Sequence, residues 1–209
     1  MMFKKYHNFI NENLDHMVYG PEREHPMPPI AIDELPLIAP PANSSDETKK
    51  EIEYINQLPM PDETDIKADE HPSNLFADFL AKKNNGPGAT NPSRKDVYEY
   101  SQKVKPIVIA LKNHFNRPRP EQLAKYHGID NLKVYPSKTA NTAAYPSGHS
   151  VQPFATAEAL SKEYPDLKSE LFDIADKIAT SRLRMRIHYP SDYEYGKMLG
   201  KKIGSIIQF

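Results

Sequence analysis

The sequence lacks several features that would point to particular classes of protein. Its 209 residues include no cysteine, which excludes a disulfide framework, a thiolate metal site and a cysteine nucleophile. A formal net charge of −1 gives no basic surface for nucleic acid, so we expect no nucleic-acid partner. No apolar run approaches the roughly 20 residues of a membrane-spanning helix, so we expect no integral membrane association. Histidine and carboxylate chemistry remain.

The first residues also lack the features of a signal peptide. They read "MMFKKYHNFINENLDHM", which carries charges and has no continuous apolar segment before a small-residue cleavage site. We therefore expect a cytoplasmic protein, and a periplasmic or secreted location stays open if another route exports the chain. Whether the chain forms a homo-oligomer is open as well.

Proline, by contrast, is abundant, with 20 residues. We expect a short helix over residues 4–18 and an extended strap over 20–42, where prolines are too frequent for regular structure. This N-terminal part, residues 1–43, is expected to cover a helical domain formed by residues 44–209. The two parts would make one globular unit.

The rest of the chain shows the periodicity of helices. Apolar residues keep helical spacing most clearly from Val97 to Phe115, and the alternation typical of strands is nowhere sustained. Ser45 is a predicted helix N-cap, and Pro190 separates the last two helices. Helices are predicted within residues 43–58, 73–83, 94–115, 120–128, 148–162, 166–187 and 191–207. We therefore predict an all-α fold, a single-domain compact helical bundle.

Residues 59–72 carry five carboxylates between prolines and are predicted to form an acidic loop. A solvated run of charge explains these carboxylates, and a divalent-cation site is the alternative. We expect no bound metal ion, because nothing in the pattern orders the carboxylates around one.

Three arginines stand near the end of the helix predicted over residues 166–187. On a wheel of about 100° per residue, Arg182 falls inside the apolar stripe, Arg186 at its edge and Arg184 on the opposite, solvated face. A buried guanidinium is costly unless an anion and hydrogen bonds compensate it. We therefore expect a negative group beside Arg182.

Two more groups of residues are suited to binding an anion. Lys112 lies at the rim of the long helix, with Arg117 and Arg119 shortly after it, although cations that neutralise a helix C-terminus are the alternative. Ser147, Gly148 and His149 begin another helix, where free N–H groups, a hydroxyl and an imidazole form an anion cradle. An ordinary serine N-cap is the alternative there.

His188 and Asp192 form the last candidate pair. Pro190 ends one helix after His188, and Asp192 lies in the first turn of the next, with Ser191 and Glu194 at capping-box spacing. A carboxylate on one ring nitrogen would fix the tautomer and leave the other nitrogen free as a nucleophile. A purely structural hydrogen bond is the alternative.

Taken together, three motifs occur in an order and spacing that resemble a known family. They are Lys-x6-Arg-Pro (Lys112 to Pro120), Pro-Ser-Gly-His (Pro146 to His149) and Ser-Arg-x5-His-x3-Asp (Ser181 to Asp192). This set resembles the signature of the type 2 phosphatidic acid phosphatase superfamily. Within it, the chain is most similar to the soluble bacterial class A nonspecific acid phosphatases, which are all-α and of similar length.

The resemblance implies metal-independent hydrolysis of small phosphate monoesters through a phosphohistidine, with no cofactor. His188 would be the nucleophile, Asp192 would orient it, and His149 would be the general acid and base. The phosphate would be bound by Lys112, Arg119, Ser147, the Gly148 amide and Arg182.

Two other functions stay open. A vanadium-dependent haloperoxidase would bind vanadate with the same motifs, although members of that family are usually much longer. A non-catalytic phosphate-binding or structural protein could also keep the motifs.

Overall fold

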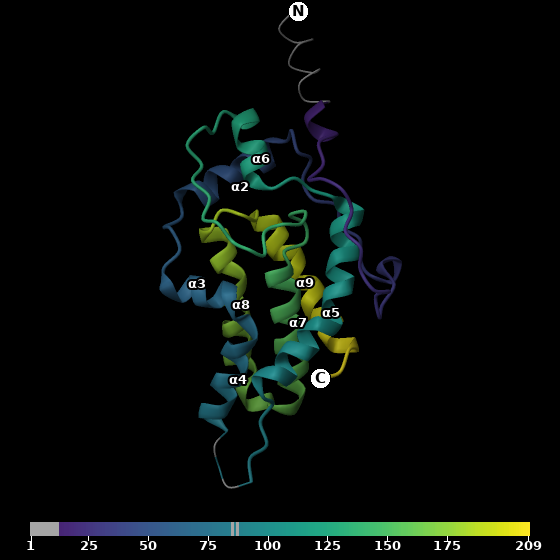
Figure 1. Ribbon diagram of the computed structural model, residues 1–209, viewed down its shortest axis with the longest axis vertical. Coiled ribbons are helices and arrows are strands. Elements are labelled where there is room, and N and C mark those ends of the chain that lie inside the picture. The colour runs from purple at the N-terminus through teal and green to yellow at the C-terminus, as the bar shows by residue number, and fades with distance from the viewer. Residues whose placement is uncertain (1–12, 85, 87) are drawn as a thin grey trace, which may run out of the picture.

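The structure of the protein, a computed structural model, describes residues 13–84, 86 and 88–209. These residues form helices and no strand, which confirms the predicted all-α class (Figure 1). The α-helices are α2 (Asp46–Gln57), α3 (Glu63–Glu70), α4 (Pro72–Lys83), α5 (Arg94–Phe115), α6 (Pro120–Leu123), α7 (Gly148–Glu163), α8 (Lys168–Arg184) and α9 (Pro190–Ile206). Short 3-10 turns cover Ile32–Glu34, Ala124–His127 and Pro165–Leu167.

Helix α7 lies in the middle of the bundle, packed against α9, α8 and α5. Two apolar clusters meet on it. Phe154 faces one cluster, which includes Ile178 of α8, and Val151 faces the other, with Val104 of α5 and Leu199 of α9. Burial of these side chains, each at most 1% exposed, fixes the position of α7 from several sides. The N-terminus of α7 is therefore held rigidly.

Helix α9 approaches α7 closely because it carries a stripe of glycines, at Gly196, Gly200 and Gly204. A Cβ atom on Gly200 would lie 2.6 Å from the carbonyl oxygen of Val151, closer than real Cβ contacts come. The two helices also start side by side, since the amide of Ser147 donates to the carbonyl of Asp192 at 3.1 Å. The stripe thus brings the first turns of α7 and α9 together.

Residues 17–45 form an extended strap, interrupted by one 3-10 turn, along the side of the bundle. Two tyrosine hydroxyls hold the strap, since Tyr145 donates to the carbonyl of Ile38 at 2.8 Å and Tyr195 to that of Pro36 at 2.9 Å. The strap therefore packs on the same helices that carry the polar motifs.

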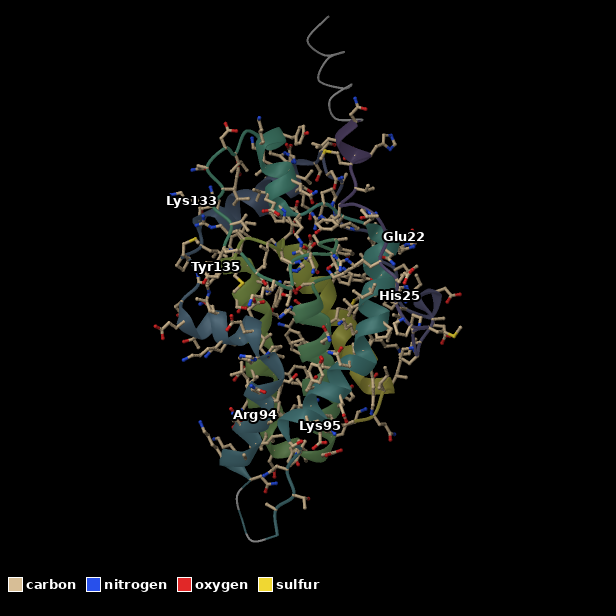
Figure 2. All side chains as sticks on the ribbon, viewed as in Figure 1. Glu22, His25, Arg94, Lys95, Lys133 and Tyr135 are labelled. Atoms are coloured by element: carbon tan, nitrogen blue, oxygen red, sulfur yellow. The ribbon has the colours of Figure 1, made fainter. Side chains whose placement is uncertain are left out.

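The helix expected over residues 4–18 falls mostly outside the described residues. Within the expected range, residues 13–15 are helical. Figure 2 shows Glu22 and His25 on the strap and, across the molecule, Lys133 and Tyr135 on the loop before α7.

The prediction of an acidic loop over residues 59–72 was wrong. Helix α3 occupies most of this segment, with Asp62 as its N-cap, and two of its carboxylates are buried rather than solvated. Asp65 is 1% exposed and Asp69 is 6% exposed. Each pairs with an arginine of α8, Asp65 with Arg184 at 2.8 Å and Asp69 with Arg182. The pairing offsets the cost of burying the charges. A run of charged residues in the sequence does not reveal which of them are paired.

The end of helix α8 also differs from expectation. The helix stops at Arg184 instead of residue 187, and Arg186 adopts a left-handed backbone with φ of 60°. The helical wheel therefore does not apply to Arg186, whose guanidinium reaches the carbonyls of Lys133 and Leu58. Arg184 is not simply solvated either, because it neutralises Asp65. This turn redirects the chain toward His188.

Within the described residues, no helix is both long enough and apolar enough to cross a membrane.

Candidate active site

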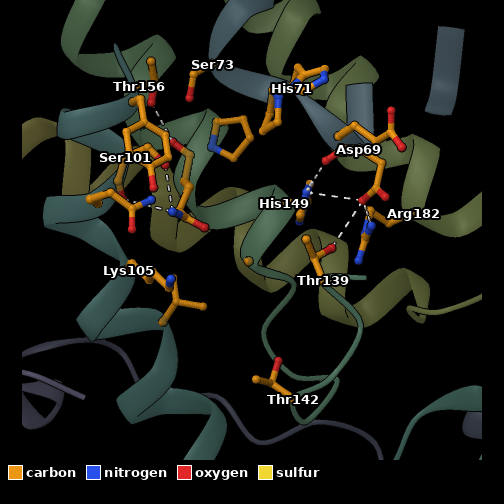
Figure 3. A pocket seen from close by; sticks show the side chains of 18 of the residues that line it. Asp69, His71, Ser73, Ser101, Lys105, Thr139, Thr142, His149, Thr156 and Arg182 are labelled. Carbon is orange, nitrogen blue, oxygen red and sulfur yellow. Dashed lines mark hydrogen bonds and ion pairs between the residues drawn. The ribbon is translucent and has the colours of Figure 1, made fainter. Parts of the chain in front are cut away.

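A cleft of about 930 Å³ opens between α5, the start of α4 and the N-terminus of α7. Six of the predicted site residues line it: Lys112, Arg119, Gly148, His149, Arg182 and His188. Figure 3 shows His149, Asp69 and Arg182 grouped on one wall, with Lys105 of α5 on another. The two remaining predicted residues, Ser147 and Asp192, are fully buried beside this wall.

His188 is buried and held by both ring nitrogens. Its Nδ1 lies 2.9 Å from Oδ2 of Asp192, and its Nε2 lies 3.3 Å from a guanidinium nitrogen of Arg119. Because the guanidinium can only donate, Nε2 is the acceptor and Nδ1 carries the proton that Asp192 accepts. The lone pair of Nε2 therefore faces the cations of the cleft.

Asp192 owes its position to the first turn of α9. Its Oδ2 also accepts from the amide of Tyr189 at 3.0 Å, so Tyr189 and Asp192 form the capping contact at this helix start. The capping box expected from Ser191 and Glu194 was therefore wrong. Pro190 begins the helix two residues earlier than that register requires.

Lys112 and Arg119 are buried near His188, at 5% and 1% exposure. The ammonium of Lys112 donates to the carbonyls of Ala143 and Ala144, and Arg119 donates to the carbonyls of Thr142 and Ile187. All four acceptors are neutral main-chain carbonyls, so these hydrogen bonds do not neutralise either cation. Burial and the charge of Arg119 lower the Lys112 pKa well below its usual value.

The structure places the carboxylate of Asp69 beside Arg182. Ser137 links the two, since its hydroxyl donates to Oδ2 of Asp69 at 2.9 Å and accepts from Arg182 at 3.0 Å. Burial lowers the pKa of Arg182 to about 9, which leaves it cationic at neutral pH. Asp69 is thus an anionic neighbour at the position where the sequence demanded one.

The N-terminus of α7 offers donors without acceptors. Ser147 has the backbone of an N-cap, yet its side chain makes no capping bond, and its buried hydroxyl has no hydrogen-bond partner. The Ser150 amide donates to the carbonyl of Ser147, whereas the amides of Gly148 and His149 have no intrahelical acceptor. A buried hydroxyl without a partner at a positive helix end is suited to an oxyanion rather than to an ordinary cap.

His149 follows in the same turn, beside Asp69. Its Nε2 lies 3.2 Å from the main-chain oxygen of Asp69 and 3.4 Å from the carboxylate (Figure 3). Burial, together with the charges of Lys112 and Arg119, lowers the pKa of His149 to about 4. The same causes, burial first, lower the His188 pKa well below its usual value. Both imidazoles are therefore neutral at pH 7 without an anion in the cleft.

Sequence reasoning missed Asp69, which lines the cleft, and two residues behind the cleft wall: Arg117, which donates to Asp192, and Glu51, which accepts from the amide of Ser191. Asp69 was assigned to a solvated loop, and Glu51 drew no notice. Arg117 stood out only as one of several cations near Arg119. Helical spacing could have placed Glu51 beside Ile52 and Ile55 near the buried face of α2, but not identified its partner.

Comparison with known protein families places this cleft in context. Residues 104–207 match the model of the PAP2 superfamily. This part of the chain belongs to the PAP2 superfamily. It contains every residue assigned a role from the sequence, and the family assignment supports phosphatase-type chemistry.

Among solved structures, the fold is similar to the crystal structure of a bacterial vanadium-dependent iodoperoxidase. The TM-score is 0.58 at 20% sequence identity, over 80% of this chain and 50% of the iodoperoxidase. The chain thus spans about half the length of that enzyme, and the likeness establishes the fold. No curated protein gives a significant match to the sequence.

Proposed function

We propose that the protein hydrolyses small phosphate monoesters through a phosphohistidine on His188. One observation carries the proposal. Nε2 of His188 is unprotonated and lies among buried cations, while Nδ1 is fixed by Asp192. The unprotonated Nε2 can attack an electrophile, and the surrounding cations favour an electrophile that carries negative charge. A phosphoryl group has both properties.

In the first step, the Nε2 lone pair attacks phosphorus and the bond from phosphorus to the ester oxygen breaks. The leaving oxygen takes a proton from His149. In the second step, water attacks the phosphohistidine and gives its proton to His149, the P–N bond breaks, and inorganic phosphate leaves. The proton stays on Nδ1 of His188, hydrogen-bonded to Asp192, whose negative charge stabilises the positive imidazole ring of the intermediate.

The equatorial oxygens of the phosphoryl group would be held by Lys112, Arg119, Arg182, the Ser147 hydroxyl and the Gly148 amide. Charge on a phosphoryl transition state is spread over these oxygens, so donors already in place lower the barrier. The partnerless hydroxyl of Ser147 and the partnerless Nε of Arg182 support this arrangement.

His149 must be protonated to act as an acid. Its pKa of about 4 applies without bound anion, and a phosphoryl dianion beside it would raise that pKa. Activity should therefore favour acidic to neutral pH.

A vanadium-dependent peroxidase is the second candidate, favoured by the fold likeness to the iodoperoxidase. Vanadate is a tetrahedral oxyanion like phosphate, and the same donors, with His188 as its nitrogen ligand, fit it. Bound vanadate would supply peroxide activation.

One assay separates the two candidates. The protein is incubated with p-nitrophenyl phosphate and EDTA, and separately with bromide or iodide, peroxide and added vanadate. We expect hydrolysis that survives EDTA and is inhibited by vanadate. Hydrolysis that EDTA abolishes and Mg²⁺ or Zn²⁺ restores would contradict the mechanism. Halide oxidation without hydrolysis would favour the peroxidase.

A further inference from the structure

Arg117 lies behind the candidate active site and is almost fully buried, with 2% exposure. One of its terminal nitrogens donates to Oδ1 of Asp192 and to the hydroxyl of Ser191, both at 2.7 Å. The other donates to Glu51 at 2.9 Å. The guanidinium also lies over the ring of Tyr189, 3.8 Å from its centroid. These contacts leave Arg117 little freedom to move.

Glu51 closes this network from helix α2. One of its oxygens accepts from Arg117, and the other accepts from the amide of Ser191 at 2.6 Å. Ser191 is the residue before Asp192 in the first turn of α9. A continuous chain of charged groups therefore runs from α2 through Arg117 to the carboxylate that holds His188.

The position of Arg117 excludes direct contact with a substrate bound in the cleft. Arg117 and Glu51 do not line the cleft, whereas Arg119, two residues later, does. Burial lowers the pKa of Arg117, but Asp192, Tyr189 and Glu51 outweigh it and keep the pKa above its usual value. Arg117 is thus a permanent cation on the side of Asp192 that faces away from the cleft.

Asp192 uses both of its oxygens. Oδ2 accepts from His188 and from the Tyr189 amide, and Oδ1 accepts from Arg117. A fully buried carboxylate stays ionised only when hydrogen bonds and an opposite charge compensate for lost water. The Nδ1–H bond of His188 depends on that ionised, correctly aimed carboxylate.

We propose that Arg117 and Glu51 are positioning residues for the nucleophile. Arg117 balances the charge of Asp192 and aims its carboxylate at Nδ1 of His188, and Glu51 keeps Arg117 in place. This role rests on the proposed function, in which His188 attacks phosphorus. It extends the site to helix α2, outside the segment that carries the family motifs.

Other charged or titratable groups also face the pair of His188 and Asp192. From α5 and the loop after it, α8, α7 and the start of α9, they are Lys112, Arg119, Arg182, His149 and Tyr189. They stay unchanged in the variants below, so a shift in titration reports the altered group.

Three variants test the network: Arg117→Gln, Arg117→Lys and Glu51→Gln. For Arg117→Gln we expect kcat on p-nitrophenyl phosphate to fall about 10- to 100-fold, with KM changed less than about threefold. Loss of the cation leaves the charge of Asp192 unbalanced beside His188, which raises the His188 pKa. The acid limb of kcat/KM should therefore move up by about one pH unit.

The other two variants separate charge from geometry. Arg117→Lys keeps the charge, but an ammonium cannot hold Asp192 and Glu51 in fixed directions. We expect about tenfold lower kcat with an acid limb near that of the wild type. Glu51→Gln removes the outer anchor, and we expect kcat to fall about three- to tenfold without an upward shift of the acid limb.

Arg184→Gln is the matched control, because it also removes the partner of a buried carboxylate, Asp65. It should leave kcat per folded molecule and the acid limb as in the wild type. The folded fraction of each variant is measured by circular dichroism.

A second readout needs no substrate. ¹⁵N NMR of the imidazoles, with His188 assigned by His188→Gln, follows its protonation directly. A wild type without hydrolysis would contradict the proposed function, and the NMR titration would still test the network. Unchanged kcat per folded molecule and unchanged His188 titration in Arg117→Gln would overturn the proposal. If that variant does not fold, full kcat in both Arg117→Lys and Glu51→Gln would overturn it.

Discussion

The two sides of the His188 ring differ in how their charges are balanced. On the Nδ1 side, Asp192 accepts from His188, and Arg117 donates to both Asp192 and Glu51, with each distance below 3 Å. On the Nε2 side lie Lys112, Arg119 and Arg182, and among the described residues Asp69 is the carboxylate that pairs with one of them, Arg182. Two carboxylates therefore share one arginine behind His188, whereas in front of it three cations share one carboxylate.

This difference gives the two sides of the ring different roles, orientation of the imidazole behind it and anion binding in front. A closed network behind the ring can hold the imidazole in one orientation, whereas unpaired donors in front have a destabilising effect that an oxyanion relieves. The predictions below test each side of the comparison.

The largest effect is expected for His188 itself. His188→Ala should reduce phosphate release from every substrate by at least about 10⁴-fold, since no covalent intermediate can form. His114→Ala, an exposed histidine of α5, is the control and should keep wild-type rates. Substantial hydrolysis by His188→Ala, measured on p-nitrophenyl and alkyl phosphates, would show that the Nε2 side is not the reacting side.

The next effect concerns His149, and it depends on the leaving group. His149→Ala should lose about 10²- to 10⁴-fold on alkyl phosphates, whose alkoxide needs a proton, and less on p-nitrophenyl phosphate. Water activation would still be slow, so rapid-mix kinetics should show a burst of nitrophenol and then slow turnover. Mass spectrometry should locate the trapped phosphate on His188. A burst with phosphate on another residue would contradict these roles.

Much of this site could be predicted because its contacts are local in sequence. His188 and Asp192 are separated by four residues across the start of α9, and Ser147, Gly148 and His149 share one helical turn. The pairing of Asp69 with Arg182 could not be predicted in the same way. It joins α3 to α8, and an acidic run looks the same in sequence whether it is solvated or buried.

A smaller effect is expected for Asp69, which competes with bound anions for Arg182. Asp69→Asn should bind phosphate more tightly, with an inhibition constant about 3- to 10-fold lower than in the wild type. Asp65→Asn removes another buried carboxylate, which pairs with Arg184, and it should leave the constant unchanged. Weaker phosphate inhibition in folded Asp69→Asn would mean that Asp69 supports the anion site instead of competing with it.

The smallest effect is the number of protons that the protein takes up when an oxyanion binds. Without an anion, the His149 pKa of about 4 leaves this ring neutral at pH 6, and an oxyanion beside it raises that pKa. Sulfate, which does not titrate in this range, should therefore bind with uptake of about one proton at pH 6, and the uptake should diminish as pH approaches 4. Calorimetry in buffers of different ionisation enthalpy measures it. His149→Gln should take up fewer protons, and equal uptake would exclude His149 as the proton acceptor.

The sequence by itself determined the helical class and the local neighbours of His188. The apolar periodicity and each of the three motifs involve residues within one or two helical turns of one another. Local backbone geometry brings residues at that spacing together. Only the tertiary structure decided which charges are paired. Glu51 meets Arg117 from 66 residues away, and Asp69 meets Arg182, because α2 and α3 pack on the rest of the bundle. Whether a charge is buried and paired is a property of that packing, which no local pattern encodes.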